Sequence, residues 1–299
     1  MTRHHPTVIS ALCAATLLLL TGCQSGGAQA DAEPEPLTLA TTPLGDDPTQ
    51  ANPVVEIAAL LEAETGRKVE IRDVPDYLSV VEAIRSDHVD FGIMSGFPSA
   101  LAVNTGEVDA LIAWEGDDTP VSTCAVLEDS PVRDVQDLRG GTLAFADQAS
   151  SSGFFMPVYM LHEAGLERGT DYEAIFAGGH EGSFAALEKG QVDAACTAVM
   201  LTKLDPPMFP FAEGQWRGIG ESPSMPITGA VLARQSLDPE TRELLQNALA
   251  TVMSEENADA LGPLASISEG VAVIDPTGEH FRSFIDIAAV AGVDLSDLK

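Results

Sequence analysis

The sequence predicts an α/β protein with two lobes, each a mostly parallel β-sheet flanked by helices, joined by two hinge crossings. Three observations support this prediction. Short apolar runs typical of strands alternate with helix-like segments along most of the chain, which is the pattern of parallel β-α-β units. The loop at 116–120 interrupts the alternation, and a second set of strands and helices follows it. A later strand at 227–233 indicates that the chain then returns to the first lobe.

The first residues of the chain have the features of an export signal. A short basic region precedes an apolar run at 8–20, which is too short to span a bilayer as a helix but suits a signal peptide. The run ends in the tetrapeptide LTGC, which resembles a bacterial lipobox ending at Cys23. We expect residues 1–22 to be a lipoprotein signal peptide and Cys23 to carry two acyl chains, enough for stable anchoring. An ordinary secretory signal with an incidental cysteine is the alternative.

A polar stretch separates this signal from the folded part of the chain. Residues 24–36 contain no aromatic or β-branched side chain, so we expect a flexible tether at 23–36. The remaining chain is long enough for one large or two medium domains. We divide it into lobe 1 (37–118), lobe 2 (119–226) and a second part of lobe 1 (227–299).

Each predicted element of the first part of lobe 1 has a local sequence reason. Asn52-Pro53 provides an N-cap and a proline at the first helical position, which predicts a helix at 54–65 that Gly66 ends. Helices are also expected at 77–85 and 98–105. Strands should separate these helices, at 37–41, 68–72, 89–94 and 108–114.

The same alternation continues through lobe 2 and into the last part of the chain. Strands are expected at 121–127, 142–146, 172–177 and 192–196. Helices at 151–164 and 181–189 should lie between them. After the strand at 227–233, Asp238-Pro239 starts an amphipathic helix, and a final helix is expected at 277–291. The crossings between the lobes are predicted near 114–121 and 223–229.

The charge of the chain excludes several classes of partner. The sequence has 15 Lys and Arg against 46 Asp and Glu, which gives a formal net charge of -31. Such a surface repels nucleic acid and anionic lipid headgroups, so we expect neither as a partner. It also repels an anionic ligand at long range. An anion would therefore be held by short-range dipoles in a closed site, since exposed charges are screened beyond about 8 Å at physiological salt.

Two cysteines remain after export. Cys13 leaves with the signal peptide and Cys23 carries the lipid, so Cys124 and Cys196 are left, each in a strand-like apolar segment. An even pair in an oxidising compartment is compatible with a disulfide or with two buried thiols. The spacing of the cysteines and histidines matches no metal site, and the sequence predicts no metal and no cofactor.

The most informative segment is a hydroxyl-rich turn between a predicted strand and a predicted helix. Ser150, Ser151, Ser152 and Gly153 follow the strand at 142–146. The first backbone N–H groups of a helix have no internal partner, and the positive end of the helix dipole favours an oxyanion there. Serine hydroxyls add donors that can rotate toward a tetrahedral ligand. A serine-rich N-cap without a ligand is the alternative.

Two further residues lie at predicted helix starts. His180 follows Gly178-Gly179, whose lack of side chains allows close approach to a ligand. The positive helix terminus disfavours protonation, so His180 is expected to act as a neutral N–H donor. Tyr77 follows Asp76 in the first lobe and would place a phenol near a cleft between the lobes. A surface histidine and a packing tyrosine are the alternatives.

The serine turn, together with Gly179-His180 and the segment 190–194 (GQVDA), resembles the phosphate-, phosphite- and phosphonate-binding proteins of ABC transporters. Pro75-Asp-Tyr77 and Val89-Asp90 add to a resemblance that runs from about Leu37 to Met253. It implies the two-lobed type II periplasmic binding protein fold, an extracytoplasmic location and an ABC transporter permease as partner. We expect a monomer, anchored to the membrane through Cys23.

The resemblance also implies roles for individual residues. Ser150, Ser151 and Ser152 would hold the phosphorus oxygens, with His180 and Tyr77 in the same site. Two carboxylates that hold the amine of aminoalkylphosphonates in the family find no match by spacing. Met200 occupies the first of these positions, and Thr228 falls near the second. We therefore expect a ligand without an amine, namely phosphite, phosphate or a short alkylphosphonate. The first lobe would close over it with Tyr77 and Ser95.

Three other functions remain open at the level of sequence. Related type II proteins bind nitrate, sulfonates or other anions, and a fold alone does not choose among ligands. A sensor lipoprotein that signals to a partner kinase would have the same features. Ser152, His180 and Asp193 supply the residue types of a serine hydrolase, but without a Gly-x-Ser-x-Gly elbow. We expect the protein not to be an enzyme.

Overall fold

The computed structural model describes residues 34–42, 53–206 and 208–293. The expected signal peptide and Cys23 lie outside the described residues, as does most of the expected tether. The described residues from Glu35 onward belong to one compact unit. None of the helices in the described ranges combines the length and the apolar composition needed to cross a membrane.

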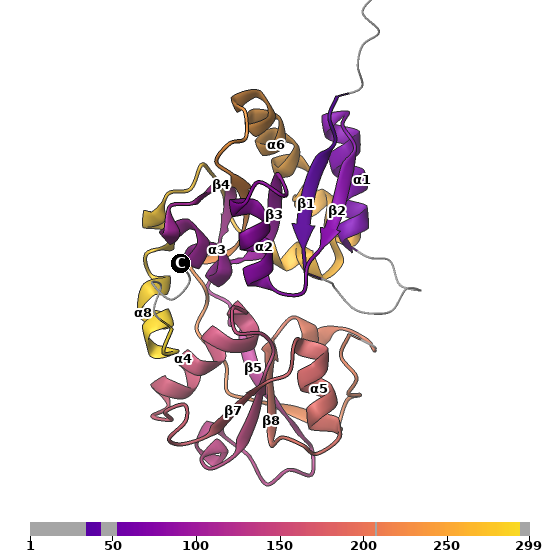
Figure 1. Cartoon of the computed structure of the whole chain (residues 1–299). Helices are drawn as coiled ribbons and strands as arrows, with labels where there is room; N and C mark the ends of the chain where they lie inside the picture. The colour runs from indigo at the N-terminus through magenta and orange to yellow at the C-terminus, as the bar shows by residue number, and fades with distance from the viewer. Residues whose placement is uncertain (1–33, 43–52, 207, 294–299) are drawn as a thin grey trace, which may run out of the picture. The chain divides into compact units, whose positions relative to one another are not determined.

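The first sheet contains six strands in the order β11-β4-β10-β3-β1-β2, of which Figure 1 labels β1, β2, β3 and β4. Its strands are β1 (Leu37–Thr41), β2 (Val69–Asp73), β3 (Phe91–Ser95), β4 (Val108–Glu115), β10 (Ile227–Arg234) and β11 (Ala272–Ile274). Helices α1 (Pro53–Thr65) and α6 (Pro239–Val252) pack on one face, with Leu61 and Leu249 against Leu37 and Leu39. Helices α2 (Tyr77–Arg85) and α3 (Gly96–Thr105) cover the other face.

The second sheet contains five strands in the order β7-β6-β8-β5-β9. Its strands are β5 (Ser122–Leu127), β6 (Thr142–Phe145), β7 (Glu173–Phe176), β8 (Ala194–Ala198) and β9 (Trp216–Ile219). Helix α4 (Met156–Glu163) packs on one face, where Leu161 joins the cluster of Leu143. Helix α5 (His180–Glu188) covers the other face, where Phe184 joins Ala144. Burial on both faces explains why these strands are nearly continuous apolar runs.

The two-lobed α/β class with mostly parallel strands is confirmed, and each sheet is mixed: β10 and β11 in the first sheet and β5 in the second run against the other strands. In each sheet only two pairings are parallel, β1 with β2 and β3, and β6 with β7 and β8. Strands β10 and β5 pair antiparallel with their neighbours. The reason is connectivity, because β10 and β5 follow the crossings directly. Each of these two strands therefore starts at the edge of its sheet where the parallel strands end, and it runs in the opposite direction.

The two crossings between the sheets run side by side. The chain leaves the first sheet after β4 and returns to it at β10. The N–H of Gly116 in the first crossing donates to the carbonyl of Pro226 in the second, at 2.9 Å. A Cβ on Gly116 would lie only 1.9 Å from the carbonyl oxygen of Met225, so this position requires glycine. The predicted lobe boundaries fall between strands of different sheets, and the division into lobes stays a prediction.

Several predicted helices differ from the structure in detail. The helix expected at 151–164 begins as a π-helical segment, η2 (Ser151–Phe155), before α4. The helix expected at 277–291 is divided into a 3₁₀ segment, η6 (Gly278–Phe281), and α8 (Phe284–Val290). The short strands β9 and β11 had no prediction. Residues 262–267 form a further 3₁₀ segment, η5.

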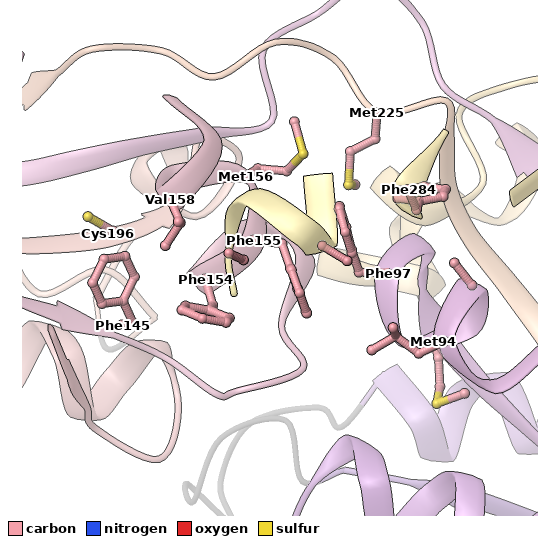
Figure 2. Packing of buried hydrophobic residues seen from close by; sticks show 14 of the residues in the cluster. Met94, Phe97, Phe145, Phe154, Phe155, Met156, Val158, Cys196, Met225 and Phe284 are labelled. Atoms are coloured by element: carbon pink, nitrogen blue, oxygen red, sulfur yellow. The ribbon is translucent and has the colours of Figure 1, made fainter. Parts of the chain in front are cut away.

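An aromatic contact joins the helices of the two sheets. The ring of Phe97, at the start of α3, stacks on that of Phe155 in η2, with centroids 4.2 Å apart and planes 5° apart. Phe284 of α8 meets Phe97 edge-on at 4.6 Å. Figure 2 shows Phe97 between these two rings. The buried cluster around them contains residues from both sheets, so an apolar contact supports the arrangement of the polar groups described next.

Candidate functional site

Four parallel strands of the two sheets are each followed by a helix that begins with a predicted site residue. Tyr77 follows β2, and Ser95 ends β3 and caps α3. Ser150 follows β6 as the N-cap of η2, and His180 follows β7 as the first residue of α5. The carboxyl ends of parallel strands meet at one edge of a sheet, where ligands of open α/β sheets bind.

Hydrogen bonds within the serine turn fix its shape. Asp147 accepts from the N–H of Ala149 through Oδ1 at 2.7 Å and from the N–H of Ser150 through its carbonyl at 3.0 Å. The hydroxyl of Ser150 accepts from the N–H of Gly153 at 3.0 Å, which is the bond of an N-cap serine. The side chain of Ser150 therefore holds its own helix in place.

The turn leaves unoccupied donors at the start of η2. Among the described residues, no acceptor pairs with the backbone N–H groups of Ser151 and Ser152, and the Ser152 hydroxyl makes no hydrogen bond. Ser152 is partly exposed, whereas Ser150 and Ser151 are buried. These groups lie at the positive end of the helix dipole. An oxyanion there would complete their hydrogen bonding.

Hydrogen bonds across the two sheets bring Tyr77, Ser95 and Ser151 together. The Ser151 hydroxyl accepts from the N–H of Phe97 at 2.9 Å and donates to Ser95 Oγ at 2.9 Å. The side chain of Ser95 also lies beside the phenol of Tyr77. The predicted contribution of Tyr77 and Ser95 from the first sheet thus meets the serine turn of the second. None of these hydrogen bonds within the described residues involves a Lys or Arg side chain.

His180 lies against the same turn. Its Nδ1 is 2.8 Å from the hydroxyl of Thr197, on β8. A Cβ on Gly153 would lie 3.0 Å from His180 Cε1, so glycine allows the imidazole to approach the turn. Burial lowers the pKa of His180 to about 4, which leaves the ring neutral at physiological pH. A neutral ring was expected from the helix terminus, but burial is the cause in the structure.

Two carboxylates lie at the site, and sequence reasoning assigned neither a role. Burial raises the pKa of Asp147, the hydrogen bond from the Ala149 N–H lowers it in part, and the charge of Asp76 adds a smaller increase. Burial raises the pKa of Tyr77 first, and the Asp147 charge raises it further, while the hydrogen bond with Ser95 lowers it. Asp147 therefore lies close to Tyr77 and Asp76, which belong to the other sheet's helix α2. The available signal was the position of Asp147, directly between β6 and the serines.

Two other residues named from the sequence make their hydrogen bonds with the backbone outside the serine turn. The hydroxyl of Thr228 donates to the carbonyls of Ile267, at 2.8 Å, and Trp114, at 3.3 Å. The hydroxyl proton of Thr228 is therefore held by backbone carbonyls, and a contact of Thr228 with the ligand stays a prediction. Asp193 accepts from the N–H of Thr142 at 2.8 Å, at the first residue of β6 and hence at the opposite end of that strand from the serines.

The position of Asp193 also argues against the serine hydrolase alternative. A catalytic triad needs a histidine held by a carboxylate and bonded to the nucleophile. The Nδ1 of His180 pairs with the hydroxyl of Thr197, while Asp193 pairs with Thr142. In the part of the chain that the structure describes, no cluster of three or more His, Cys, Asp or Glu side chains could hold a metal. The arrangement suits binding of an anion by neutral donors.

A disulfide lies behind the site. Of the two alternatives for Cys124 and Cys196, the structure has the disulfide, which joins directly opposed residues of β5 and β8. Both cysteines are fully buried. The bond is adjacent in sequence to Thr197, so it ties the strand that contacts His180 to the strand that leads from the first crossing.

Comparison with known proteins agrees with this arrangement. Residues 40–277 match the family described as ABC transporter, phosphonate, periplasmic substrate-binding protein. The phosphate-import protein PhnD of Mycolicibacterium smegmatis is 29% identical over 268 residues, covering 83% of this chain and 82% of its own.

Two solved structures have a similar fold. PhnD1 of Prochlorococcus marinus, in complex with methylphosphonate, superposes with a TM-score of 0.67 at 15% identity, covering 85% of this chain and 97% of its own. A binding protein component of an ABC phosphonate transporter from Pseudomonas aeruginosa has a TM-score of 0.68 at 16% identity, covering 87% of each chain. Because the family match covers most of the sequence, the chain belongs to the periplasmic substrate-binding proteins of phosphonate ABC transporters.

Proposed function

We propose that this binding protein captures a small phosphorus oxyanion, namely phosphite, phosphate or a short alkylphosphonate, and presents it to an ABC transporter permease. The observation that carries the proposal is the convergence of four helix starts, from two sheets, on one cluster of uncharged donors. The donors are the Ser151 and Ser152 N–H groups, the hydroxyls of the turn and His180. Such groups bind an anion without a cationic side chain.

The choice of phosphorus over sulfur rests on the carboxylate of Asp147. Near neutral pH phosphate keeps at least one P–OH proton, and phosphite and alkylphosphonates are close enough to their second pKa to be bound in the P–OH form, whereas sulfate and nitrate have no such proton. A half-buried carboxylate beside the donors accepts a hydrogen bond from a ligand with a P–OH group and repels an anion that has no proton to donate. The names of similar proteins support the same class, since one imports phosphate and another was solved with methylphosphonate.

Closure of the two lobes would complete the site. In the structure the Ser151 hydroxyl bonds directly to Ser95 and to the N–H of Phe97. A ligand entering between the lobes would replace part of this contact with its own oxygens. The two adjacent crossings at 116–121 and 220–226 would then act as the hinge.

We further propose that the mature protein is a monomer held at the outer face of the membrane by lipid on Cys23. The LTGC sequence and the preceding apolar run support this anchor. A Cys23→Ser variant expressed in the native host should lose acyl labelling and appear in the medium. Retention of Cys23→Ser in the membrane fraction would show that another feature anchors the protein.

Calorimetric titration with a ligand panel tests the proposed ligand class. The panel contains phosphite, phosphate, methylphosphonate, 2-aminoethylphosphonate, sulfate and nitrate. We expect the first three to include the tightest ligand, with sulfate and nitrate at least about a hundredfold weaker, the discrimination expected from one charged acceptor. Tightest binding of sulfate or nitrate would overturn the phosphorus assignment. Tightest binding of 2-aminoethylphosphonate would show that Asp76 and Asp147 hold an amine.

A further inference from the structure

The hydroxyl of Thr197 has one hydrogen-bonding partner. Thr197 lies on β8, between β5 and β6, and is completely buried. Among the described residues its hydroxyl bonds only to Nδ1 of His180, at 2.8 Å. A buried hydroxyl carries a proton that it must donate, because an unpaired donor in the protein interior costs about 1–3 kcal/mol.

The partner ring can accept that proton at one position only. Burial lowers the pKa of His180 to about 4, so the imidazole is neutral under physiological conditions. A neutral imidazole has one N–H donor and one nitrogen acceptor. If Nδ1 carried the proton, it would donate to the Thr197 hydroxyl oxygen, and the proton of that buried hydroxyl would have no acceptor among the described residues. The contact is satisfied when Nδ1 accepts and Nε2 carries the proton.

The rest of the ring lies against the serine turn. The point where a Cβ of Gly153 would sit is 3.0 Å from His180 Cε1 and 2.9 Å from Ser150 Oγ. Nε2 is bonded to Cε1, on the side of the ring away from the nitrogen that Thr197 occupies. Nε2 has no hydrogen-bond partner among the described residues, so an N–H there is available on a ring that lies against the turn.

We propose that Thr197 is a positioning residue, which fixes His180 as the Nε2–H tautomer so that the ring donates to an oxygen of the bound anion. The other tautomer would present a lone pair to the oxyanion and repel it. This inference rests on the proposed function, because it assigns a role at the same site. The adjacent Cys124–Cys196 disulfide supports it by holding β8 in register with β5.

Nitrogen-15 NMR of the ligand-free wild-type protein tests the tautomer directly. The side-chain signals of His180 are assigned by their absence in His180→Gln. At pH 7 we expect the chemical shifts of a protonated Nε2 and an unprotonated Nδ1. A protonated Nδ1 would overturn the proposal. The measurement needs no variant of Thr197 and no ligand, so it stands even if every phosphorus oxyanion in the calorimetric panel fails to bind.

A pair of substitutions tests the consequence for binding. Thr197→Val keeps the shape of the side chain and removes the hydroxyl, whereas Thr197→Ser keeps the hydroxyl. We expect Thr197→Val to show a mixture of tautomers and to weaken phosphite binding about tenfold, the effect of losing one oriented hydrogen bond. Thr197→Ser should keep the single His180 tautomer and the wild-type affinity for phosphite. A Thr197→Val protein with unchanged urea midpoint, one tautomer and wild-type phosphite affinity would contradict the proposal.

Discussion

Asp147 adds a carboxylate acceptor to the serine turn, beside the N–H and hydroxyl groups proposed to bind the anion. Its Oδ1 accepts from the Ala149 N–H, and the charge of the carboxylate acts on Tyr77 across the two sheets. Burial raises its pKa, as expected for a carboxylate that has no cationic partner within the described part of the chain. A residue that shapes the turn can therefore also select the protonation state of the ligand.

Replacing Asp147 with Asn should reduce selectivity for protonated ligands. The amide keeps the size of the side chain but removes the charge that favours P–OH and repels sulfate. We expect the ratio of the sulfate and phosphite dissociation constants to fall about tenfold or more, the range for a hydrogen bond to a charged group. Calorimetry of both ligands measures this ratio. An unchanged ratio would show that Asp147 only shapes the turn.

Gly153 is required by close packing around it. A Cβ at this position would lie 2.5 Å from Ala146 Cβ and 2.9 Å from Ser150 Oγ. We expect Gly153→Ala to lower the free energy of unfolding by about 1–3 kcal/mol and to weaken ligand binding, because the turn must shift. Urea unfolding and calorimetry measure the two effects. Gly278→Ala is the control, since the nearest neighbour of its Cβ would be 3.9 Å away, and wild-type behaviour of both variants would refute the prediction.

At the scale of elements, most helices and strands could be predicted from local sequence. We predicted helix starts from Asn52-Pro53 and Asp238-Pro239, and strands from apolar runs. The observed elements lie within a few residues of these predictions. The direction of β5 and β10 could not be predicted, because it depends on the edge of the sheet at which each crossing ends. The strands β9 and β11, of 4 and 3 residues, are too short to show a period.

The candidate site was predictable in part for the same reason. Ser150, Ser151, Ser152 and His180 lie at helix starts, which local patterns mark. The roles of Asp147 and Thr197 depend on contacts between segments that are distant in sequence, and no local pattern indicates these contacts. Thr228 was chosen by spacing alone, and its hydroxyl proved to be held by backbone carbonyls.

The disulfide should contribute strongly to the pairing of β5 and β8. It closes a loop with a sequence separation of 72 residues, for which the chain-entropy estimate is about 4 kcal/mol. We expect the double variant Cys124→Ala/Cys196→Ala to lose about 2–4 kcal/mol of unfolding free energy in urea. Reductant should lower the melting temperature of the wild type and leave that of the double variant unchanged. Equal sensitivity of the two proteins would contradict this account.

At the scale of the whole molecule, an aromatic contact accompanies the polar one between the sheets. Phe97 stacks on Phe155 and meets Phe284, beside the bond from its own N–H to Ser151. The net charge of -31 opposes the approach of an anion. Apolar contact between the lobes can therefore stabilise the closed form independently of the ligand's charge.

Weakening this contact should affect closure as well as stability. Phe97→Ala removes a buried ring and should cost about 3–5 kcal/mol of unfolding free energy. Phe209→Ala, which removes a buried ring from the cluster around Phe184, is the matched control. Small-angle scattering with and without phosphite should show reduced compaction in Phe97→Ala and wild-type compaction in Phe209→Ala. Equal compaction in both variants would show that the contact between the sheets plays no part in closure.

A crystal structure with bound phosphite would show the proposed site itself. We expect ligand oxygens about 2.7–3.2 Å from the backbone N–H groups of Ser151 and Ser152 and from His180 Nε2. We also expect that no Lys or Arg side chain touches the ligand. Phosphite held by a basic side chain, or bound away from the Ser150–Ser152 turn, would contradict the account.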